Sequence, residues 1–437
     1  MKREAFRKMK RFFKKIIVAI LTTESRLIIR KYKPVIVAIT GSVGKTTTKD
    51  AIYSVLSSSS YVRKSEKSYN SELGVPLTII GCQSGWLSFQ RWLSNILRGF
   101  LLIIFPFHYP KTLILEVGAD RPGDIKSITS WLTPDIAVFT AFADVPVHVE
   151  FFKDVDELVK EKVYLAKALK AGGVLVVNSD DERSSHFKEF APKAFVISYG
   201  ISGGATVRGS NYEIYYEYGF PRGIRFKVSV GGNTFPVSIE GSLGRQHMYS
   251  ALSAVGVAIS EKINLVRAAQ SLQSFLPPLG RMKIIAGIKN SLIIDDTYNS
   301  SPEAAKVALE TLFEIKSEGR RIAVLGDMLE LGKFTAEAHK DIGVKATSAD
   351  LIFTVGIRSR AIAEGALSSG FDESRIFQYE NYESVGKDIE KMILPKDIIL
   401  IKGSQGMRME KIVEEIMAEP LLKERLLVRQ EPEWSKR

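Results

Sequence analysis

The chain has 437 residues, which is too many for one ordinary hydrophobic core and predicts two or three domains. With 45% apolar and 25% charged residues, the composition is that of a globular protein and excludes a disordered one. The single cysteine, Cys82, excludes an intrachain disulfide framework and a cysteine-built zinc site, and it favours a reducing, cytoplasmic compartment.

Most of the net charge of +12 lies in residues 1–33. This segment holds twelve Lys or Arg against two acids, a net of +10, which leaves the rest of the chain near neutral at +2. We interpret it as a basic arm on a neutral body, which argues against a nucleic-acid-binding body. Its apolar run, 16–21, is far shorter than the ~20 residues that span a bilayer, and no signal-peptide cleavage site follows. Two alternatives stay open: a basic amphipathic helix on an anionic membrane surface, or a solvated helix packed on the domain.

Short apolar strands alternate with helices after the arm. Residues 35–39 are β-branched and apolar and predict a buried strand, and a helix is expected from Lys45 to about Leu56. A second long helix is expected within 154–170. This alternation predicts a mostly parallel sheet with helices on both faces. Three later segments have the same strand pattern: 112–117, 135–140 and 173–178.

A phosphate-binding loop joins the first strand to its helix. Residues 40–48 read TGSVGKTTT, and the glycines let backbone N–H groups turn toward phosphate oxygens at a helix N-terminus. Lys45 is expected to reach the β- and γ-phosphates of ATP, and the Thr46 hydroxyl to bind Mg²⁺. The strict motif has glycine where this chain has Ile39. The predicted nucleotide contacts are Gly41, Ser42, Val43, Gly44, Lys45, Thr46 and Thr47.

A carboxylate that can hold the metal follows at the end of the second predicted strand. Glu116 stands at the carboxyl end of strand 112–117, where doubly wound sheets place their ligands. Metal binding or orientation of water fits an acid at this place. The alternative is an acid paired with a nearby Lys or Arg.

One segment is unusual because residues 73–115 contain no Asp or Glu. Its only cations are Arg91, Arg98 and Lys111, and its aromatic residues gather within about 82–111. A membrane-dipping helix is one interpretation, since Trp, Tyr and Arg favour the interface. A buried helix or a partner-binding surface is the other.

The second half of the chain predicts a small antiparallel sheet and then another α/β domain. Residues 194–240 alternate apolar and polar positions between glycine-rich turns, and Pro277–Gly280 then interrupts the chain. We therefore expect a basic amphipathic arm (1–33), a central P-loop-type ATP-binding domain with a mostly parallel sheet and an antiparallel subsheet (34–276), and a doubly wound, Rossmann-like α/β domain (277–437). Its strands are expected at 292–296, 321–326, 351–356 and 397–403.

Several blocks, in order between residues 34 and 415, resemble the Mur ligase family, and in particular its MurF branch. That branch adds D-alanyl-D-alanine to a UDP-muramoyl peptide. Each block alone is weak to moderate, but together they are highly specific. Besides the phosphate loop they are NSELGVPLT (70–78), LEVGA (115–119), His148 with Glu161 and Lys162, NSDD (178–181), DDTYNSSPE (295–303), LGDMLELG (325–332) with His339, and KGS (402–404).

The resemblance implies a ligase that forms an amide through an acyl phosphate, without a protein nucleophile. It assigns a first Mg²⁺ to Thr46 and Glu116, and a second to His148 and to Lys162, whose family counterpart is carbamoylated. The alternative for Lys162 is an ordinary surface lysine on an amphipathic helix. Arg281 is expected at the ATP phosphates and Asp296 at the ribose. The catalytic residues implied are Lys45, Lys162, His148 and Arg281.

The sequence departs from the family pattern in three places. The family's UDP-binding domain has no counterpart before the loop, where the basic arm stands. The asparagine expected at the adenine is Ser250, and Asp120-Arg121 replaces a common Asn-His. These departures motivate the hypothesis of an enzyme that acts peripherally at the inner membrane surface on a lipid-linked muramoyl peptide, with anionic lipid contacted by 1–33 and 82–111.

Other functions remain as alternatives. One is a related ligase of the folate- or amino-acid-polymerising type, against which the 295–303 block argues. A second is a membrane-associated P-loop ATPase, which has no need of His148, Lys162 or that block. A degenerate binding protein is a third, and the intact loop argues against it.

Overall fold

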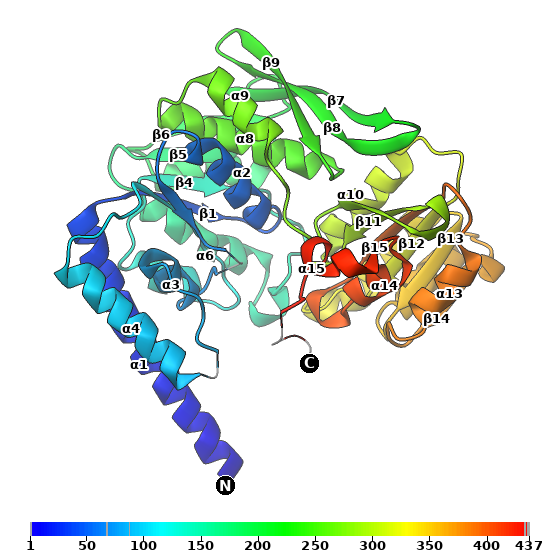
Figure 1. The fold of residues 1–437 in the computed structure, drawn as a ribbon, viewed down its shortest axis with the longest axis horizontal. Coiled ribbons are helices and arrows are strands. Elements are labelled where there is room, and N and C mark those ends of the chain that lie inside the picture. The colour runs from blue at the N-terminus through cyan, green and yellow to red at the C-terminus, as the bar shows by residue number, and fades with distance from the viewer. Residues whose placement is uncertain (1, 67–68, 87, 432–433, 435–437) are drawn as a thin grey trace. The chain divides into compact units, whose positions relative to one another are not determined.

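The computed structural model describes residues 2–66, 69–86, 88–431 and 434, with the backbone alone for 2–12 and 185 (Figure 1). The chain divides into two compact units. Unit 1 comprises residues 1–142, 156–208 and 250–271, and unit 2 comprises 143–155, 209–249 and 272–437. In the described part of the chain, no helix is long and apolar enough to cross a membrane.

Unit 1 contains the expected parallel sheet. The central strand β1 (Val35–Thr40) pairs in parallel with β3 on one side and β4 on the other. The central parallel strands β1, β3, β4 and β5 are short, and their apolar residues are largely buried, as sheets covered on both faces require. The strand order is β2 (Val62–Lys64), β3 (Thr112–Glu116), β1, β4 (Ile136–Phe139), β5 (Val174–Asn178), β6 (Phe195–Gly200).

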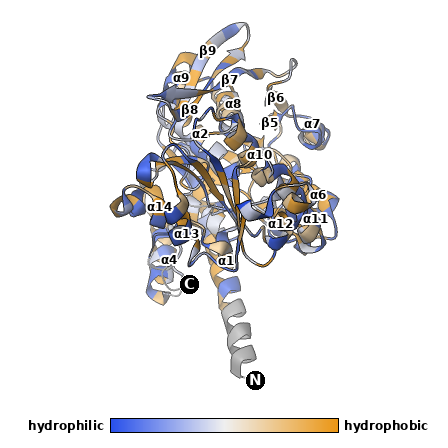
Figure 2. Ribbon diagram, turned by 90° about the vertical axis from the view of Figure 1, so that its right-hand side faces the viewer, coloured by the Kyte–Doolittle hydropathy of each residue, from blue (hydrophilic) through white to orange (hydrophobic). Residues whose placement is uncertain are grey.

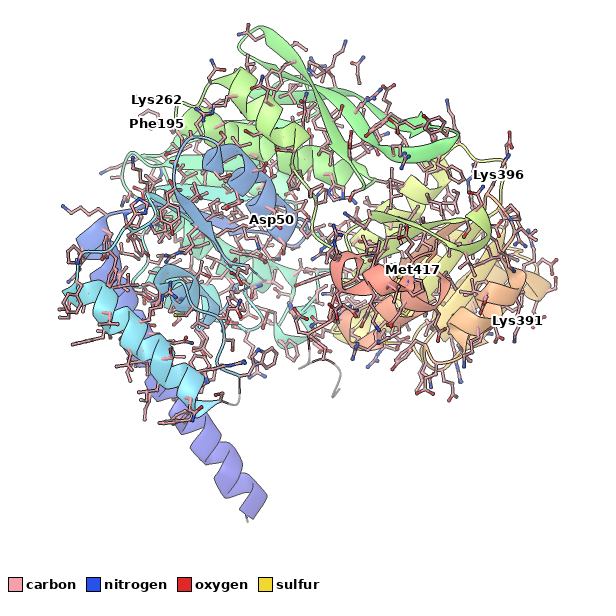
Figure 3. All side chains as sticks on the ribbon, in the orientation of Figure 1. Asp50, Phe195, Lys262, Lys391, Lys396 and Met417 are labelled. Carbon is pink, nitrogen blue, oxygen red and sulfur yellow. The ribbon has the colours of Figure 1, made fainter. Side chains whose placement is uncertain are left out.

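The helix after the phosphate loop, α2 (Lys45–Ser57), lies beside this sheet. Asp50 on α2 accepts a hydrogen bond from Lys64 on β2 at 2.5 Å between Nζ and Oδ1 (Asp50 is labelled in Figure 3). The buried positions of α2 recur at helical spacing, so one face of the helix packs inward. The other helices that lie wholly or partly in unit 1 are α3 (Gly74–Ile80), α5 (Asp124–Thr129), α6 (Val155–Lys167), α7 (Glu182–Ser185), α8 (Arg245–Ser260) and α9 (Leu265–Gln273).

Two further helices of unit 1 come from the basic arm and from the acid-free segment. The arm is a single helix, α1 (Lys2–Tyr32), and the acid-free segment contains α4 (Phe89–Ile104). They lie side by side, blue and cyan in Figure 1. Ile17, Leu21 and Ile28 of α1 are buried, so the arm packs on the domain.

Unit 2 contains a second, mostly parallel sheet whose strands are largely hydrophobic (orange in Figure 2). Its edge strand β10 runs antiparallel to β11, and the other pairs are parallel. The order is β10 (Lys283–Ala286), β11 (Leu292–Asp296), β15 (Ile398–Lys402), β12 (Arg321–Gly326), β13 (Leu351–Val355), β14 (Ile376–Tyr379). The helices are α10 (Pro302–Glu314), α11 (Thr335–Ala346), α12 (Arg360–Ser368), α13 (Val385–Met392), α14 (Glu410–Ile416) and α15 (Lys423–Leu426).

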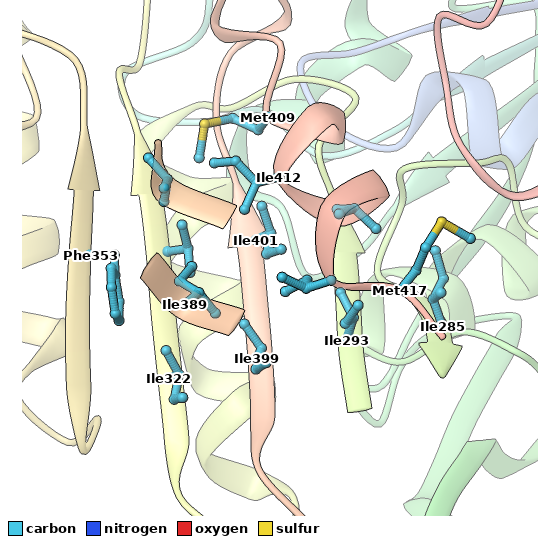
Figure 4. Close-up of a cluster of buried hydrophobic side chains, with 14 of the residues drawn as sticks. Ile285, Ile293, Ile322, Phe353, Ile389, Ile399, Ile401, Met409, Ile412 and Met417 are labelled. Carbon is cyan, nitrogen blue, oxygen red and sulfur yellow. The ribbon is translucent and has the colours of Figure 1, made fainter. Parts of the chain in front are cut away.

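A dense apolar core lies on one face of this second sheet. Ile293, Ile399 and Ile401 of the strands pack against Ile389 of α13 and Ile412 of α14, all fully buried (Figure 4). Close packing of this kind fixes the strand ends from which the 295–303 and 402–404 blocks emerge.

The expected antiparallel segment is also present. Strands β8 (Phe220–Val230) and β9 (Asn233–Glu240) pair antiparallel over eight residue pairs. Strand β7 (Val207–Glu217) begins differently, because its first residues pair in parallel with β6. The segment therefore continues the strand order of the parallel sheet rather than starting a separate one.

Candidate active site

The phosphate loop takes its shape from two glycines in the left-handed region of backbone conformation. Gly41 has φ 146° and Gly44 has φ 88°. A Cβ on Gly41 would lie 1.9 Å from the Oγ1 of Thr140, so another residue would fit there only if Thr140, directly after β4, shifted. Gly44 stands at the start of α2 and accepts from the N–H of Thr48 at 2.8 Å.

Ser42 and Val43 fasten the loop to the end of β4. Their backbone N–H groups donate to the carbonyl of Ala141 at 2.9 and 3.2 Å. These two backbone N–H groups thus hold the loop in place. The contact that we expect between Ser42, Val43 and a nucleotide would therefore use atoms other than these N–H groups. Their role at ATP stays a prediction.

Lys45 folds back over its own loop. Its ammonium donates to the carbonyls of Gly41 at 2.9 Å and Ser42 at 3.4 Å. Both acceptors belong to the loop expected to hold the phosphates, so the charge already stands where an anion is expected. No rearrangement of the strand or helix is needed for Lys45 to serve as the phosphate cation.

Thr46 and Glu116 meet beside the loop. The Thr46 hydroxyl donates to Glu116 Oε2 at 3.1 Å, and Glu116 is buried. In the parallel pairing of β1 with β3, Glu116 lies opposite Ile39, the residue directly before the phosphate loop. The register of the sheet therefore places Glu116 beside the loop. Hydroxyl and carboxylate oxygens next to a phosphate loop are the donors that Mg²⁺ takes, so these residues fit the ion.

Lys162 is a buried lysine rather than a surface one, which overturns the alternative drawn from the sequence. It is 3% exposed, and its Nζ donates to the Gly41 carbonyl at 2.9 Å. Burial, and then the charge of Lys45, hold the pKa of Lys162 well below its ordinary value. Burial therefore disfavours the charged ammonium at this place.

Glu161, the neighbour of Lys162, has a structural role. Its carboxylate accepts from the N–H groups of Gly123 at 3.0 Å and Lys126 at 2.9 Å. It thus caps the start of α5, where an acid is also favoured by the helix dipole. This fixes the turn of α6 that carries Lys162.

His148 belongs to unit 2, where it contacts an acid that the sequence did not single out as its partner. Its Nδ1 lies 2.6 Å from Oε2 of Glu330. Both residues adopt left-handed backbone conformations, with φ 72° and 64°, which is uncommon for residues other than glycine. Such strain gathers at functional sites. The shared ion expected for His148 and Lys162 stays a prediction.

Asp296, expected at the ribose, is part of a buried ion pair in unit 2. Lys402 lies 2.6 Å from its Oδ2, and the N–H of Met282 donates to its Oδ1 at 3.2 Å. Burial is the main reason that the pKa of Lys402 is lowered, and the charge of Asp296 opposes it. The pair joins the ends of β11 and β15, so Asp296 has a structural role whether or not it also contacts a ribose.

Arg281 lies over an aromatic ring of the 295–303 block. Its guanidinium is 4.2 Å from the ring centroid of Tyr298, whose N–H donates to Gly280 at 3.1 Å. The backbone carbonyl of Arg281 lies 3.2 Å from Nε2 of His247, a fully buried imidazole whose pKa burial lowers to about 4. Arg281 is therefore held at the backbone and at the side chain, and its contact with the ATP phosphates stays a prediction.

Arg429 is a residue that the sequence analysis did not single out. Its guanidinium donates to the carbonyl of Thr297 at 3.1 and 3.0 Å, to the carbonyl of Tyr298, and to Oε2 of Glu410 at 2.8 Å. Arg429 therefore joins the C-terminal segment to the 295–303 block, although the two are more than one hundred residues apart in the sequence. An isolated arginine near a chain end carries no pattern from which such a contact could be read.

Known proteins match most of the chain. The Mur ligase middle domain matches residues 39–87 and 102–258, and the Mur ligase glutamate ligase domain matches 280–405. The protein is an ATP-dependent ligase with a mixed α/β fold. It belongs to the Mur ligase family.

Its relatives within that family include several ligases of the MurF branch. It is 27% identical over 388 residues to the UDP-N-acetylmuramoyl-tripeptide–D-alanyl-D-alanine ligase of Bacillus subtilis (strain 168), covering 88% of this chain and 76% of that one. With the Escherichia coli (strain K12) ligase of the same name it shares 24% over 382 residues, covering 86% and 76%.

Solved structures agree on the fold. MurF from Thermotoga maritima in complex with ADP superposes with a TM-score of 0.74 at 24% identity, covering 93% of this chain and 84% of that one. MurF from Acinetobacter baumannii gives 0.74 at 22% identity, covering 90% and 79%. The expected fold class and enzyme class are confirmed, and enzymes of this family use ATP with Mg²⁺.

Proposed function

We propose that this ligase joins a dipeptide amine, D-alanyl-D-alanine or a close analogue, to the terminal carboxylate of a muramoyl peptide. The observation that carries the proposal is that Lys45 and Lys162 both donate to the Gly41 carbonyl of the phosphate loop, beside which Thr46 donates to Glu116. The names of the relatives supply the substrate class. A plain ATPase has no evident use for the buried Lys162.

The reaction balances in two displacements. A substrate carboxylate oxygen attacks the γ-phosphorus of ATP, and the bond to ADP breaks. The amine then attacks the acyl carbon, its extra proton leaves, and phosphate departs with the oxygen that came from the carboxylate. Lys45 and Arg281 offset the charge that gathers on the transferring phosphoryl group, so the protein acts by positioning and electrostatics.

Thr46 and Glu116 would hold the first Mg²⁺, which when bound neutralises phosphate charge. Thr46 would approach through its hydroxyl, and Glu116 through the carboxylate that already accepts from it. Asp296 is proposed near the ribose, in addition to its pairing with Lys402. Gly41, Gly44 and Thr47 are proposed to line the phosphates.

Lys162 is proposed to be carbamoylated. Its uncharged amine attacks the carbon of CO₂, one N–H proton leaves, and an anionic carbamate forms. The anion would stand beside the Lys45 ammonium, where the unmodified group is a second cation that burial disfavours. With His148, it is proposed to hold a second Mg²⁺.

The amine and the carboxylate are identified by one assay. ADP release is measured with a panel of muramoyl peptides, both UDP-linked and lipid-linked, with and without D-alanyl-D-alanine. The proposal predicts ADP release that requires both a muramoyl peptide and an amine. Release that needs glutamate or folate instead points to a polymerising ligase, and release indifferent to any amine refutes the ligase chemistry.

We also propose that the enzyme works peripherally at the inner face of the membrane. The basic helix α1 and the α4 segment support this location, and the surface they form is treated next.

A further inference from the structure

Helix α4 exposes a row of large apolar side chains, which is unusual for a surface helix. Its outward row of apolar side chains is between 43% and 64% exposed. Its inward face contains the polar Asn95 and the small Gly99 beside Trp92 and Leu102. Exposed apolar rows of this extent mark an interaction surface. The outward row is Phe89, Leu93, Leu97, Phe100, Leu101 and Ile104.

Side chains of α1 satisfy the carbonyl groups at the end of α4. Lys31 donates to the carbonyls of Leu102 at 3.0 Å, Ile103 at 2.9 Å and Phe105 at 2.6 Å. The Tyr32 hydroxyl donates to Leu102 at 2.9 Å. Helix ends usually leave these acceptors to water, which is costly in a medium without water. Here the protein supplies the donors, so the end of α4 tolerates a low-dielectric surrounding.

The two helices are in close contact, so their outward side chains form one joint surface. A Cβ on Gly99 would lie 2.2 Å from Oε2 of Glu24 on α1, so a larger residue there would displace the end of the Glu24 side chain. Phe13 of α1 extends the apolar row, with its ring centroid 6.2 Å from that of Phe89. Lys14 of α1 is tied to Glu72 at 2.9 Å.

Both helices also carry exposed cations. Arg91 and Arg98 on α4 and Lys15, Arg26 and Arg30 on α1 are exposed. The acid of α1 within the described side chains, Glu24, is buried against α4. An apolar row together with exposed positive charge complements an anionic lipid surface, where acyl chains lie beneath phosphate groups.

We propose that the joint surface of α1 and α4 docks on an anionic lipid bilayer. The apolar row of α4 enters the headgroup level, and the exposed Lys and Arg pair with lipid phosphates. At 16 residues α4 is too short to span, so it lies in the plane of the interface. The match to the Mur ligase middle domain begins at residue 39 and is interrupted at 88–101, so most of this surface lies outside the residues that the family model matches. The proposal does not depend on the identity of the ligase substrates.

The test is flotation of the full-length protein with vesicles of phosphatidylglycerol and phosphatidylcholine, and with phosphatidylcholine alone. The wild type is expected to float with the anionic vesicles at least ~10-fold more than with the neutral ones. Leu97→Asp with Phe100→Asp is expected to abolish flotation. A matched control, Val266→Asp, replaces an equally exposed residue on α9 and is expected to float as the wild type does.

A second pair of variants separates charge from apolar insertion. Arg26→Gln with Arg30→Gln is expected to reduce flotation several-fold and to weaken its salt dependence. Lys391→Gln with Lys396→Gln, on the surface of unit 2 (Figure 3), is the control and is expected to change nothing. ADP release with soluble substrate monitors the fold in every variant and keeps this test separate from that of the ligase.

Tryptophan quenching by brominated phospholipid keeps the proposal testable if an Asp variant fails to fold. Trp86 is exposed just before α4, so vesicles that contain the brominated lipid are expected to quench its fluorescence. Trp86→Phe is expected to remove most of that quenching. Absence of wild-type flotation and quenching with anionic vesicles overturns the proposal. So does a concentration-dependent dimer, lost in the Leu97 and Phe100 variant, that binds no vesicle, because the surface would then join two copies.

Discussion

Replacement of Lys162 is the sharpest probe of the site. The side chain is 3% exposed and its Nζ donates to the Gly41 carbonyl at 2.9 Å, so its removal takes one group from beside the proposed phosphate site. If the group is a carbamate, Lys162→Ala removes an anion that orients metal and phosphates. Loss of one such preorganised group lowers kcat by about 10²–10³.

Related variants separate the carbamate from a plain amine. Lys162→Arg is expected to stay as slow as the alanine variant, because a guanidinium does not react with CO₂. Short carboxylic acids are expected to restore part of the activity of Lys162→Ala. Lys160→Ala, an exposed lysine on the same helix, is the control and should behave as the wild type does.

The assay is ADP release in buffer stripped of CO₂ and then supplied with isotopically labelled bicarbonate. The wild type should slow on removal of CO₂ and recover on its return, with a labelled carbamate signal by NMR that is absent from Lys162→Ala. Full activity of Lys162→Ala, or full activity of Lys162→Arg, would refute the reasoning.

Three further predictions concern stability and nucleotide binding. Burial raises the pKa of Glu24 to about 7 from 4.5, so the folded state retains a proton between these values and the wild type should lose stability as pH rises through them. Above pH 7, the free energy of unfolding in urea should be ~2 kcal/mol higher for Glu24→Gln than for the wild type. Below pH 4.5 the two free energies should converge. A difference between them that does not change with pH contradicts this prediction. Gly41→Ala should lower the free energy of unfolding by ~2 kcal/mol and weaken the binding of an ATP analogue, as judged by thermal shift. Gly203→Ala, whose Cβ would meet open space, is the control and should change neither quantity. Arg429→Met removes one of the partners of the buried Glu410 and should lower the free energy of unfolding by ~3 kcal/mol. An unchanged urea midpoint would show that Arg429 does not stabilise the 295–303 block.

Local patterns were sufficient to predict the phosphate loop and the strands around it. Glycine spacing, a β-branched run and a helix start lie within a few residues of one another, so sequence alone locates Lys45 and Thr46. Glu116 was found by the same logic, since the ends of parallel strands meet at one edge of a sheet.

Contacts between distant segments could not be read in this way. The burial of Lys162 depends on how α6 packs on the loop, and periodicity alone leaves either face of that helix open. The pairing of His148 with Glu330 and of Arg429 with Thr297 joins positions more than one hundred residues apart. The outward direction of the apolar row on α4 also followed only from the structure, because composition does not tell which face is inward.

The most direct test of the central claim is the fate of the carboxylate oxygen. The muramoyl peptide is prepared with a heavy isotope of oxygen in its terminal carboxylate, and the phosphate released during amide formation is analysed by mass spectrometry. Transfer through an acyl phosphate predicts one heavy oxygen in each phosphate released. Amide formation with unlabelled phosphate would contradict the account.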